Sequence, residues 1–158
     1  YNAVAELTKS GVIRGYEDGT FRPDQAITRA ELTAIAARFA KISTDRTVDF
    51  SDVSGNAWYY DAVRTAVSYG WVTGYEDGTF RPEQSIARGE TATIVNRMLA
   101  RIPDLNAIDQ GAGTRFADIG SGYWGFYEVT EATTNHEYTR SSNTAREVWT
   151  SWESSKAS

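Results

Sequence analysis

The fold is decided by a short stretch, Gly15-Tyr16-Glu17-Asp18-Gly19-Thr20-Phe21-Arg22-Pro23, which recurs unchanged at residues 74–82. The match continues from residues 24–31 to residues 83–90, so that 13 of 17 positions are identical at an offset of 59 residues. Chance does not produce such a match. A fixed period indicates a repeat protein, in which stacked units bury a shared core.

A second element repeats at a different offset. Phe50-Ser51-Asp52-Val53, followed by Trp58, matches Phe116-Ala117-Asp118-Ile119, followed by Trp124. The two elements together define a complete unit, which contains the Phe-x-Asp-Val start, the Trp, a helix, the Asp-Gly loop and a second helix. The chain then divides into a first unit without its start (1–40), a connector (41–49), the complete second unit (50–102), a connector (103–115) and a degenerate third unit (116–158).

Apolar spacing predicts the first, outer helix of each unit. Ala62, Val63, Ala66 and Val67 recur at helical spacing before Gly70, which is suited to end a helix. In the first unit the same pattern consists of Ala3, Val4 and Leu7, followed by Gly11.

The second, inner helix begins at a capping box, Thr28-Arg29-Ala30-Glu31, in which the Thr and Glu side chains bind free amides reciprocally. In the second unit Ala87 replaces the Thr, which removes the side-chain cap. The apolar stripes that should face the core are Leu32, Ile35, Ala36 and Phe39, and then Ile94, Val95, Met98 and Ile102. Thr144-x-x-Glu147, with Val148 and Trp152 one turn apart, predicts a short third inner helix, and three inner helices would form a bundle.

Composition excludes several classes of protein. A net charge of -5 argues against a nucleic-acid surface, and the absence of Cys excludes disulfides and thiolate metal sites. No apolar stretch reaches the roughly 18 residues of a membrane helix, so no membrane insertion is expected. The chain opens mid-pattern on Tyr1-Asn2-Ala3-Val4, which we interpret as a fragment of a longer protein.

Taken together, Phe-x-Asp-Val…Trp, Gly-Tyr-x-Asp-Gly-Thr-Phe-x-Pro and Ile-Thr-Arg-Ala-Glu resemble the signature of the S-layer-homology domain. The resemblance implies an all-α, pseudo-threefold repeat bundle at the extracellular bacterial surface. It also implies noncovalent binding of secondary cell-wall polysaccharides linked to peptidoglycan, often pyruvylated, in grooves between units. The binding residues that it implies are Arg29, Arg88, Trp58, Trp124, Asp18, Gly19, Asp77 and Gly78. We add the loop tyrosines Tyr16 and Tyr75, which we expect to be exposed.

Structural roles compete with these assignments. Each Arg could instead pair with an acidic residue of a neighbouring unit, and Glu31 and Glu90 fit their capping role better than ligand contact. The aromatic residues Phe21, Phe50, Phe80 and Phe116 are expected in the core, while Trp58 and Trp124 should pack partly and expose an edge.

No metal or cofactor is expected. Calcium spacing fails, because placing Gly19 at position six of an EF-hand loop puts Arg14 first and Gln25 twelfth; Asp18 and Asp77 should instead hold turns. The single histidine, His136, aligns with Gly70 and is expected to be a helix-terminal or packing residue and not a catalyst.

The prediction is a non-catalytic cell-wall-binding module. A glycosidase would need one asymmetric carboxylate pair, whereas the carboxylates here duplicate with the repeat. The alternative is a structural or protein–protein assembly domain of a surface protein that self-associates with neighbouring chains.

Overall fold

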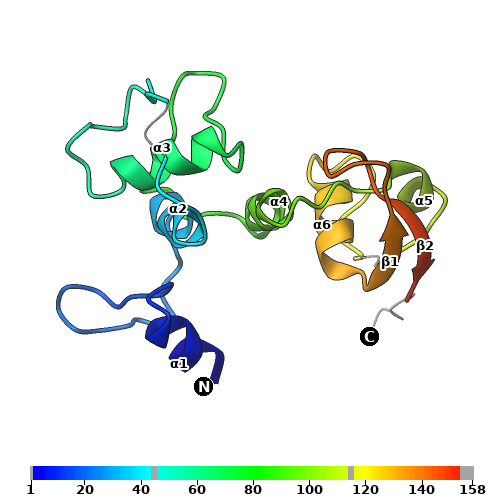
Figure 1. The fold of residues 1–158 in the computed structure, drawn as a ribbon, viewed down its shortest axis with the longest axis horizontal. Helices are drawn as coiled ribbons and strands as arrows, with labels where there is room; N and C mark the ends of the chain where they lie inside the picture. Colours follow the sequence, from blue (N-terminus) through cyan, green and yellow to red (C-terminus); the bar gives the residue numbers. More distant parts are fainter. Residues whose placement is uncertain (1, 44–45, 114–115, 154–158) are drawn as a thin grey trace. The chain divides into compact units, whose positions relative to one another are not determined.

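The computed structural model describes residues 2–43, 46–113 and 116–153 (Figure 1). The chain divides into two compact units, unit 1 (residues 1–86) and unit 2 (residues 87–158), whose bounds differ from those of the sequence repeats. In the described parts of the chain the secondary structure is mostly helical, with six helices and one two-stranded hairpin. Each unit is described by itself.

Unit 1 (residues 1–86) contains α1 (Asn2–Lys9), α2 (Arg29–Ala37) and α3 (Tyr60–Ser68). The predicted outer helices are confirmed as α1 and α3, and Gly11 and Gly70 follow them with φ of +75° and +72°. The helix α2 begins at the predicted capping box, in which Thr28 N donates to Glu31 Oε2 at 2.8 Å and Glu31 N donates to Thr28 Oγ1 at 3.2 Å. Because α2 packs against α3, the inner helix of the first repeat pairs with the outer helix of the second.

The buried face of α2 differs from the predicted stripe. Small residues form it, Ala30, Thr33, Ala34, Ala36 and Ala37, whereas Leu32 and Ile35 are half-buried and Phe39 is 59% exposed. The prediction for Phe39 is therefore wrong. Small side chains allow a neighbouring helix to approach closely, so the packing does not depend on the largest apolar residues.

The aromatic core of unit 1 lies under the second Asp-Gly loop. Phe80 is fully buried and stacks on Phe50, with ring centroids 5.5 Å apart. The sequence placed four phenylalanines in the core. That prediction is wrong for Phe21 and Phe116, which are each 42% exposed. The third repeat has no Asp-Gly-Thr-Phe loop to supply a stacking partner for Phe116.

Unit 2 (residues 87–158) contains α4 (Arg88–Met98), α5 (Leu105–Asp109), α6 (Phe126–Thr133), β1 (His136–Thr139) and β2 (Val148–Trp152). As in unit 1, an inner helix, α4, packs against the outer helix of the next repeat, α6. On α4, Ile94 is buried and Met98 half-buried, but Val95 is exposed, and the helix ends before Ile102. The connector contains an unexpected short helix, α5, which Asp104 caps by accepting from Ala107 N.

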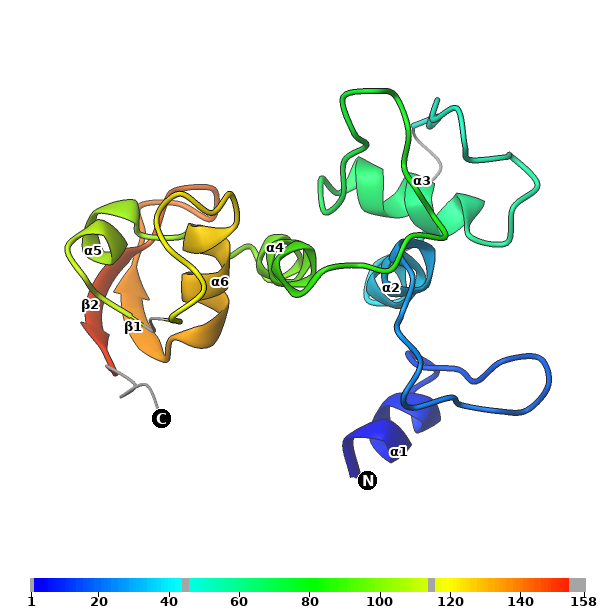
Figure 2. The same cartoon turned by 180° about the vertical axis from the view of Figure 1, so that it is seen from behind.

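The predicted third inner helix at residues 144–152 is wrong. This segment forms β2, which pairs antiparallel with β1, with Tyr138 opposite Trp149, and the hairpin lies beside α6 in both views (Figure 1, Figure 2). Val148, Trp149 and Trp152 are β-branched or aromatic, and such residues favour a strand. The strand also carries Trp149 into a core with Ile108, Ala112 and Phe126, a burial that outweighs the local helix signal of Thr144-x-x-Glu147.

The substitution Gly74→Ala tests the tight packing of the second loop. A Cβ at Gly74 would lie 2.2 Å from a carbon of the Phe50 ring and 3.0 Å from the Thr79 carbonyl oxygen, whereas one at Gly55 would meet nothing within 4 Å. We expect Gly74→Ala to lower the free energy of unfolding by about 1–3 kcal/mol through overpacking. Gly55→Ala, the matched control, should change it by no more than about 0.5 kcal/mol. Denaturant titration measures both, and equal effects would show that the loop does not need this glycine.

Candidate functional site

Arg29, the first residue of α2, is held against the loop of the second repeat. The side chain is 8% exposed, its Nη2 donates to the Thr73 carbonyl at 2.7 Å, and its guanidinium lies over the rings of Tyr75 and Phe80 at 5.0 and 4.8 Å. The structure therefore joins three of the predicted features at one place, the Arg, the loop Tyr and the Asp-Gly loop. It also makes Arg29 a packing residue between repeats.

The amides at the start of α2 are already bonded. Arg29 N donates to the Gln84 carbonyl and Ala30 N to the Pro82 carbonyl, both at 2.9 Å, while Glu31 N donates to Thr28. These three amides are therefore not available for an anion, although free amides at a helix start commonly bind one.

Arg88 occupies the same motif position at the start of α4, but its side chain is exposed. Within the described residues the Arg88 side chain makes no hydrogen bond or ion pair. The difference has a plain cause: the repeat that follows Arg88 has no Gly-Tyr-Glu-Asp-Gly-Thr-Phe loop to receive it. Only half of the capping box remains here, in which Ala87 N donates to Glu90 Oε2 at 3.0 Å.

Aromatic residues of the third repeat lie beside the start of α4. A Cβ at Gly89 would be 2.3 Å from the Tyr123 hydroxyl, which explains why Gly replaces the Ala of the first copy. The Tyr123 ring lies 5.4 Å from the ring of Trp124, which is 62% exposed. Unit 2 therefore exposes Arg88 next to Gly89, and it exposes the indole of Trp124 next to Tyr123.

Trp58 occupies the corresponding position in unit 1 and is 65% exposed. Its ring meets the buried Tyr59 edge-on, with centroids 5.3 Å apart. Both tryptophans therefore expose more than the predicted edge, and both lie against a more buried tyrosine.

The two Asp-Gly loops have the same internal bonding. In the second loop, Asp77 accepts from Thr79 N at 3.0 Å and Thr79 Oγ1 at 2.6 Å, and pairs with Arg81 at 2.9 Å. In the first loop, Asp18 has the same arrangement with Thr20 and Arg22. Gly19 and Gly78 have φ of +78° and +77°, so the predicted turn role of both carboxylates is confirmed.

These bonds set the acidity of both carboxyl groups. Hydrogen bonds from Thr79 and then Arg81 lower the pKa of Asp77 to about 2, and those from Thr20 and Arg22 hold the pKa of Asp18 well below its usual range. The arginines also cover the loop tyrosines, because Arg22 lies 4.1 Å from the Tyr16 ring centre and Arg81 lies 3.9 Å from that of Tyr75. Both tyrosines are half-buried, less open than expected.

Tyr16 connects its loop to α2. Its hydroxyl donates to Glu31 Oε1 at 2.8 Å, and this bond raises the pKa of Tyr16. Burial raises the pKa of Glu31, but the hydrogen bonds from Thr28 and Tyr16 outweigh it and leave the pKa below its usual value. Glu31 is thus engaged as a capping residue, as predicted.

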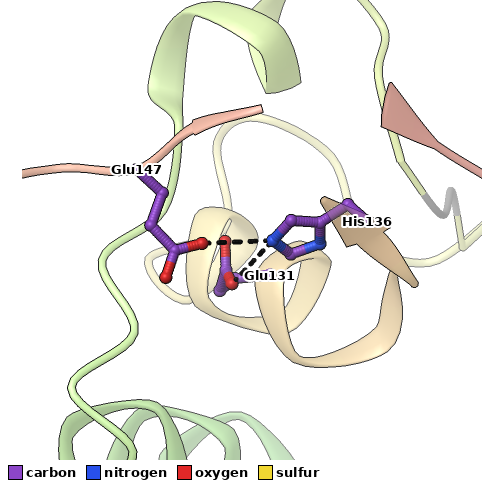
Figure 3. A group of neighbouring side chains, drawn as sticks. All are labelled: Glu131, His136 and Glu147. Carbon is purple, nitrogen blue, oxygen red and sulfur yellow. Dashed lines mark hydrogen bonds and ion pairs between the residues drawn. The ribbon is translucent and has the colours of Figure 1, made fainter. Parts of the chain in front are cut away.

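The sequence did not reveal the cluster in which Glu131, His136 and Glu147 converge (Figure 3). His136 lies in β1 beyond the end of α6, and its ring stacks on Trp149 at 3.9 Å, so it is a buried packing residue within a strand. Burial raises the pKa of Glu131 above its usual value, even though Arg101 lies beside it. One signal was available: Glu131 aligns with Thr65, a core position of the second repeat that is fully buried.

Known proteins match most of this chain. The S-layer homology domain model matches residues 1–33 and 49–92. The cellulosome-anchoring protein of Acetivibrio thermocellus is 37% identical over 142 residues, covering 86% of this chain and 30% of that protein. The chain belongs to the S-layer homology domain family. Membership of this family makes the chain a non-catalytic, cell-surface anchoring module, as the sequence predicted.

Two further relatives are named as surface proteins. Cell surface glycoprotein 1 of Acetivibrio thermocellus is 36% identical over 86% of this chain and 6% of its own length. The surface-layer 125 kDa protein of Lysinibacillus sphaericus is 37% identical over 59% of this chain and 8% of its own. The chain thus spans less than a third of each of these relatives. Among the described residues, every helix is too short or too polar to cross a bilayer.

Asp52 joins the Phe-x-Asp-Val start to the second loop. Its carboxylate accepts from Phe80 N at 2.8 Å and from Arg81 N at 2.7 Å, and Arg81 adopts a positive φ of 59°. We expect Asp52→Ala to lower the free energy of unfolding by about 1–3 kcal/mol, since two amides lose a charged acceptor. Asp61→Ala, which removes only a surface pair with Arg64, should cost less than about 1 kcal/mol. Chemical denaturation compares the two, and an Asp52→Ala protein as stable as the control would contradict the role of this carboxylate.

The low pKa of Asp77 predicts an acid-resistant loop. A carboxyl whose folded pKa is depressed contributes stability above its unfolded pKa and loses it as the pH falls through the folded value. The contribution of Asp77 should therefore decline only between its ordinary pKa of 3.8 and about 2. Carboxyl carbon NMR across this range checks it. In Thr79→Val the pKa of Asp77 should rise toward the ordinary value, and an unchanged pKa would show that Thr79 is not the cause.

Proposed function

We propose that the domain anchors its parent protein by binding an anionic secondary cell-wall polysaccharide, with sugars carrying a carboxylate, such as pyruvylated N-acetylmannosamine, as the preferred ligands. The observation that carries the proposal is the exposure of Arg88, which precedes Gly89, and of Trp124, whose ring lies against Tyr123. The names of the relatives, a cellulosome-anchoring protein and surface-layer proteins, agree with attachment to the cell surface.

The chemistry of Arg88 and Trp124 fits an acidic sugar. The guanidinium of Arg88 can bind both oxygens of a carboxylate, and the adjacent start of α4 favours negative charge. The exposed indole of Trp124 offers an apolar face for the C–H groups of a sugar ring. Tyr123, packed between Gly89 and Trp124, keeps the two groups in a fixed relation.

Arg29 has a different part in the proposal. Its buried guanidinium and its bond to the Thr73 carbonyl suit a residue that positions the second loop and Tyr75 more than one that receives the ligand first. The ligand would meet Trp58 and the exposed rim of the loop at Asp77 and Gly78. The three repeats would supply these surfaces as grooves of a pseudo-threefold arrangement, with the third altered by its hairpin.

Calorimetric titration with a defined pyruvylated wall disaccharide tests the proposal. Arg88→Ala should lower the affinity about tenfold or more, since a hydrogen bond to a charged group contributes about 1.5–3 kcal/mol. Its melting temperature should change little, because the Arg88 side chain is exposed. Arg29→Ala should instead lower the melting temperature as well as the affinity. Arg146→Ala is the control, since Arg146 is an exposed Arg of the same unit as Arg88.

Two outcomes would contradict the proposal. One is undiminished affinity in the Arg29/Arg88 double variant. The other is the absence of binding by the unaltered chain to both the disaccharide and purified wall polysaccharide. Self-association measured by light scattering in the second case would favour the assembly alternative.

A further inference from the structure

Three charged or ionisable side chains meet in the interior of unit 2. Glu131 lies near the end of α6, His136 begins β1, and Glu147 immediately precedes β2. The side chains of all three are fully buried, and both carboxylates point toward the imidazole (Figure 3). Buried charges are costly, so such a group needs a compensating positive charge.

The contacts of His136 fix where its lone pair points. Nδ1 lies 2.8 Å from the Thr134 carbonyl oxygen, which can only accept, so Nδ1 carries the proton. Nε2 then faces Glu131 Oε1 at 3.2 Å and Glu147 Oε2 at 3.1 Å. An Arg101 nitrogen, Nη2, also lies 2.7 Å from Nε2.

Neither protonation state of His136 satisfies all of these contacts. A neutral imidazole accepts from Arg101 but leaves the Nε2 lone pair facing two carboxylate oxygens. A protonated imidazole donates to the carboxylates but turns an N–H toward the guanidinium, which has only donors. The arrangement therefore contains an unresolved conflict that a cation between the three acceptors would remove.

Glu131 Oε1 is paired with Arg101 by charge but has no well-aligned hydrogen-bond donor. This buried oxygen accepts no hydrogen bond of acceptable geometry, although Arg101 Nη2 lies 2.6 Å away. The other oxygen, Oε2, accepts from Trp149 Nε1 at 3.3 Å, so the carboxylate is held with Oε1 directed into the cluster.

We propose that Glu131, His136 and Glu147 bind one divalent transition-metal ion, with Zn²⁺ as the best match. The candidate ligand atoms lie within 4.8 Å of one another. Zn²⁺ holds nitrogen and oxygen ligands at about 2.0–2.2 Å, which places neighbouring ligands of a tetrahedron about 3.3–3.6 Å apart. The Nε2–oxygen distances of 3.2 and 3.1 Å are close to the lower end of that spacing.

The donor set and its surroundings favour Zn²⁺. Imidazole suits Zn²⁺ better than it suits Ca²⁺ or Mg²⁺, and three protein ligands are common in its sites. The Nδ1–H bond to the Thr134 carbonyl orients the ring in the way that metal-binding histidines are usually oriented. Trp149 covers the ring on one side and holds Glu131 through its indole nitrogen.

Arg101 is the internal competitor of the metal. Its guanidinium pairs with Glu131 and, through Nε, with Glu147 at 2.9 Å, so it supplies positive charge at the same place. It is the most exposed member of the group, with 27% of its side chain accessible, and it can move outward. Entry of the ion would require that movement, which makes Arg101 a determinant of affinity.

The ion would join three segments that are distant in sequence. The end of α6, the start of β1 and the residue before β2 would be fixed to one centre, which closes the hairpin onto the helix. These ligands come together only in the folded chain, so binding energy becomes folding energy for unit 2.

The test uses the whole chain without a histidine tag, stripped with a chelator and titrated with Zn²⁺ alone in a calorimeter. We expect one ion per chain and a melting temperature that rises with Zn²⁺ concentration. Glu131→Gln and His136→Gln should each weaken binding about tenfold or more. Arg101→Gln should strengthen it, because the competing cation is removed. Glu137→Gln is the matched control, since Glu137 is exposed on the same strand and bonded to Ser151.

Substitution with Co²⁺ provides a readout that needs no variant. The unaltered chain should give the intense visible absorption of tetrahedral coordination, which surface carboxylates do not produce. The proposal is overturned if neither the unaltered chain nor Arg101→Gln binds Zn²⁺, or if His136→Gln, which leaves the chain without any imidazole, binds as tightly as the unaltered chain. A weak, octahedral Co²⁺ spectrum would equally overturn it.

Discussion

Two backbone amides at the start of α2 have their hydrogen-bond acceptors in the following repeat. Arg29 N and Ala30 N donate to the carbonyls of Gln84 and Pro82, 55 and 52 residues further along the chain by their numbering. A helix end that is buried must have its free amides bonded, so the first inner helix is complete only when the second loop lies against it. This constraint explains why the compact unit of the structure extends to residue 86, across the repeat boundary near residue 40.

The shape of that second loop depends in turn on the start of its own repeat. Asp52 binds the amides of Phe80 and Arg81, and Phe50 stacks on Phe80. The loop then presents Thr73, Tyr75 and Phe80 to Arg29. The identical loop sequence of the first repeat has the same internal bonds around Asp18, yet its Phe21 stays exposed. Internal bonds thus define the turn, whereas burial comes from the neighbouring segment.

This division decides what could be predicted from the sequence. The capping box at Thr28, the turns at Asp18 and Asp77 and the glycines that end α1 and α3 are local features, and all were predicted correctly. Phe39 was assigned to the core by an apolar stripe, and Phe21 and Phe116 because small repeat cores need large aromatic residues. Burial requires a partner that neither argument supplies. The candidate site follows the same rule, since Arg29 and Arg88 share one motif and differ in exposure because only the first is followed by a matching loop.

The third repeat shows what replaces a missing loop. In the second repeat the core position of α3 holds Thr65, whose hydroxyl accepts from Ser43 N at 3.2 Å and donates to the Ser43 carbonyl at 3.5 Å. At the aligned position of α6 stands Glu131, a charge that no single backbone contact can satisfy. The hairpin supplies partners for this carboxylate. Strand β1 contributes His136, and the segment before β2 contributes Glu147. Trp149 on β2 donates to Glu131 and fills the core. A helix at residues 144–152 would have placed these groups on a different period, so the buried charge and the strand require each other. Aligning the repeats places Glu131 at the position of Thr65, but the path of the chain after α6 determines which residues contact the carboxylate.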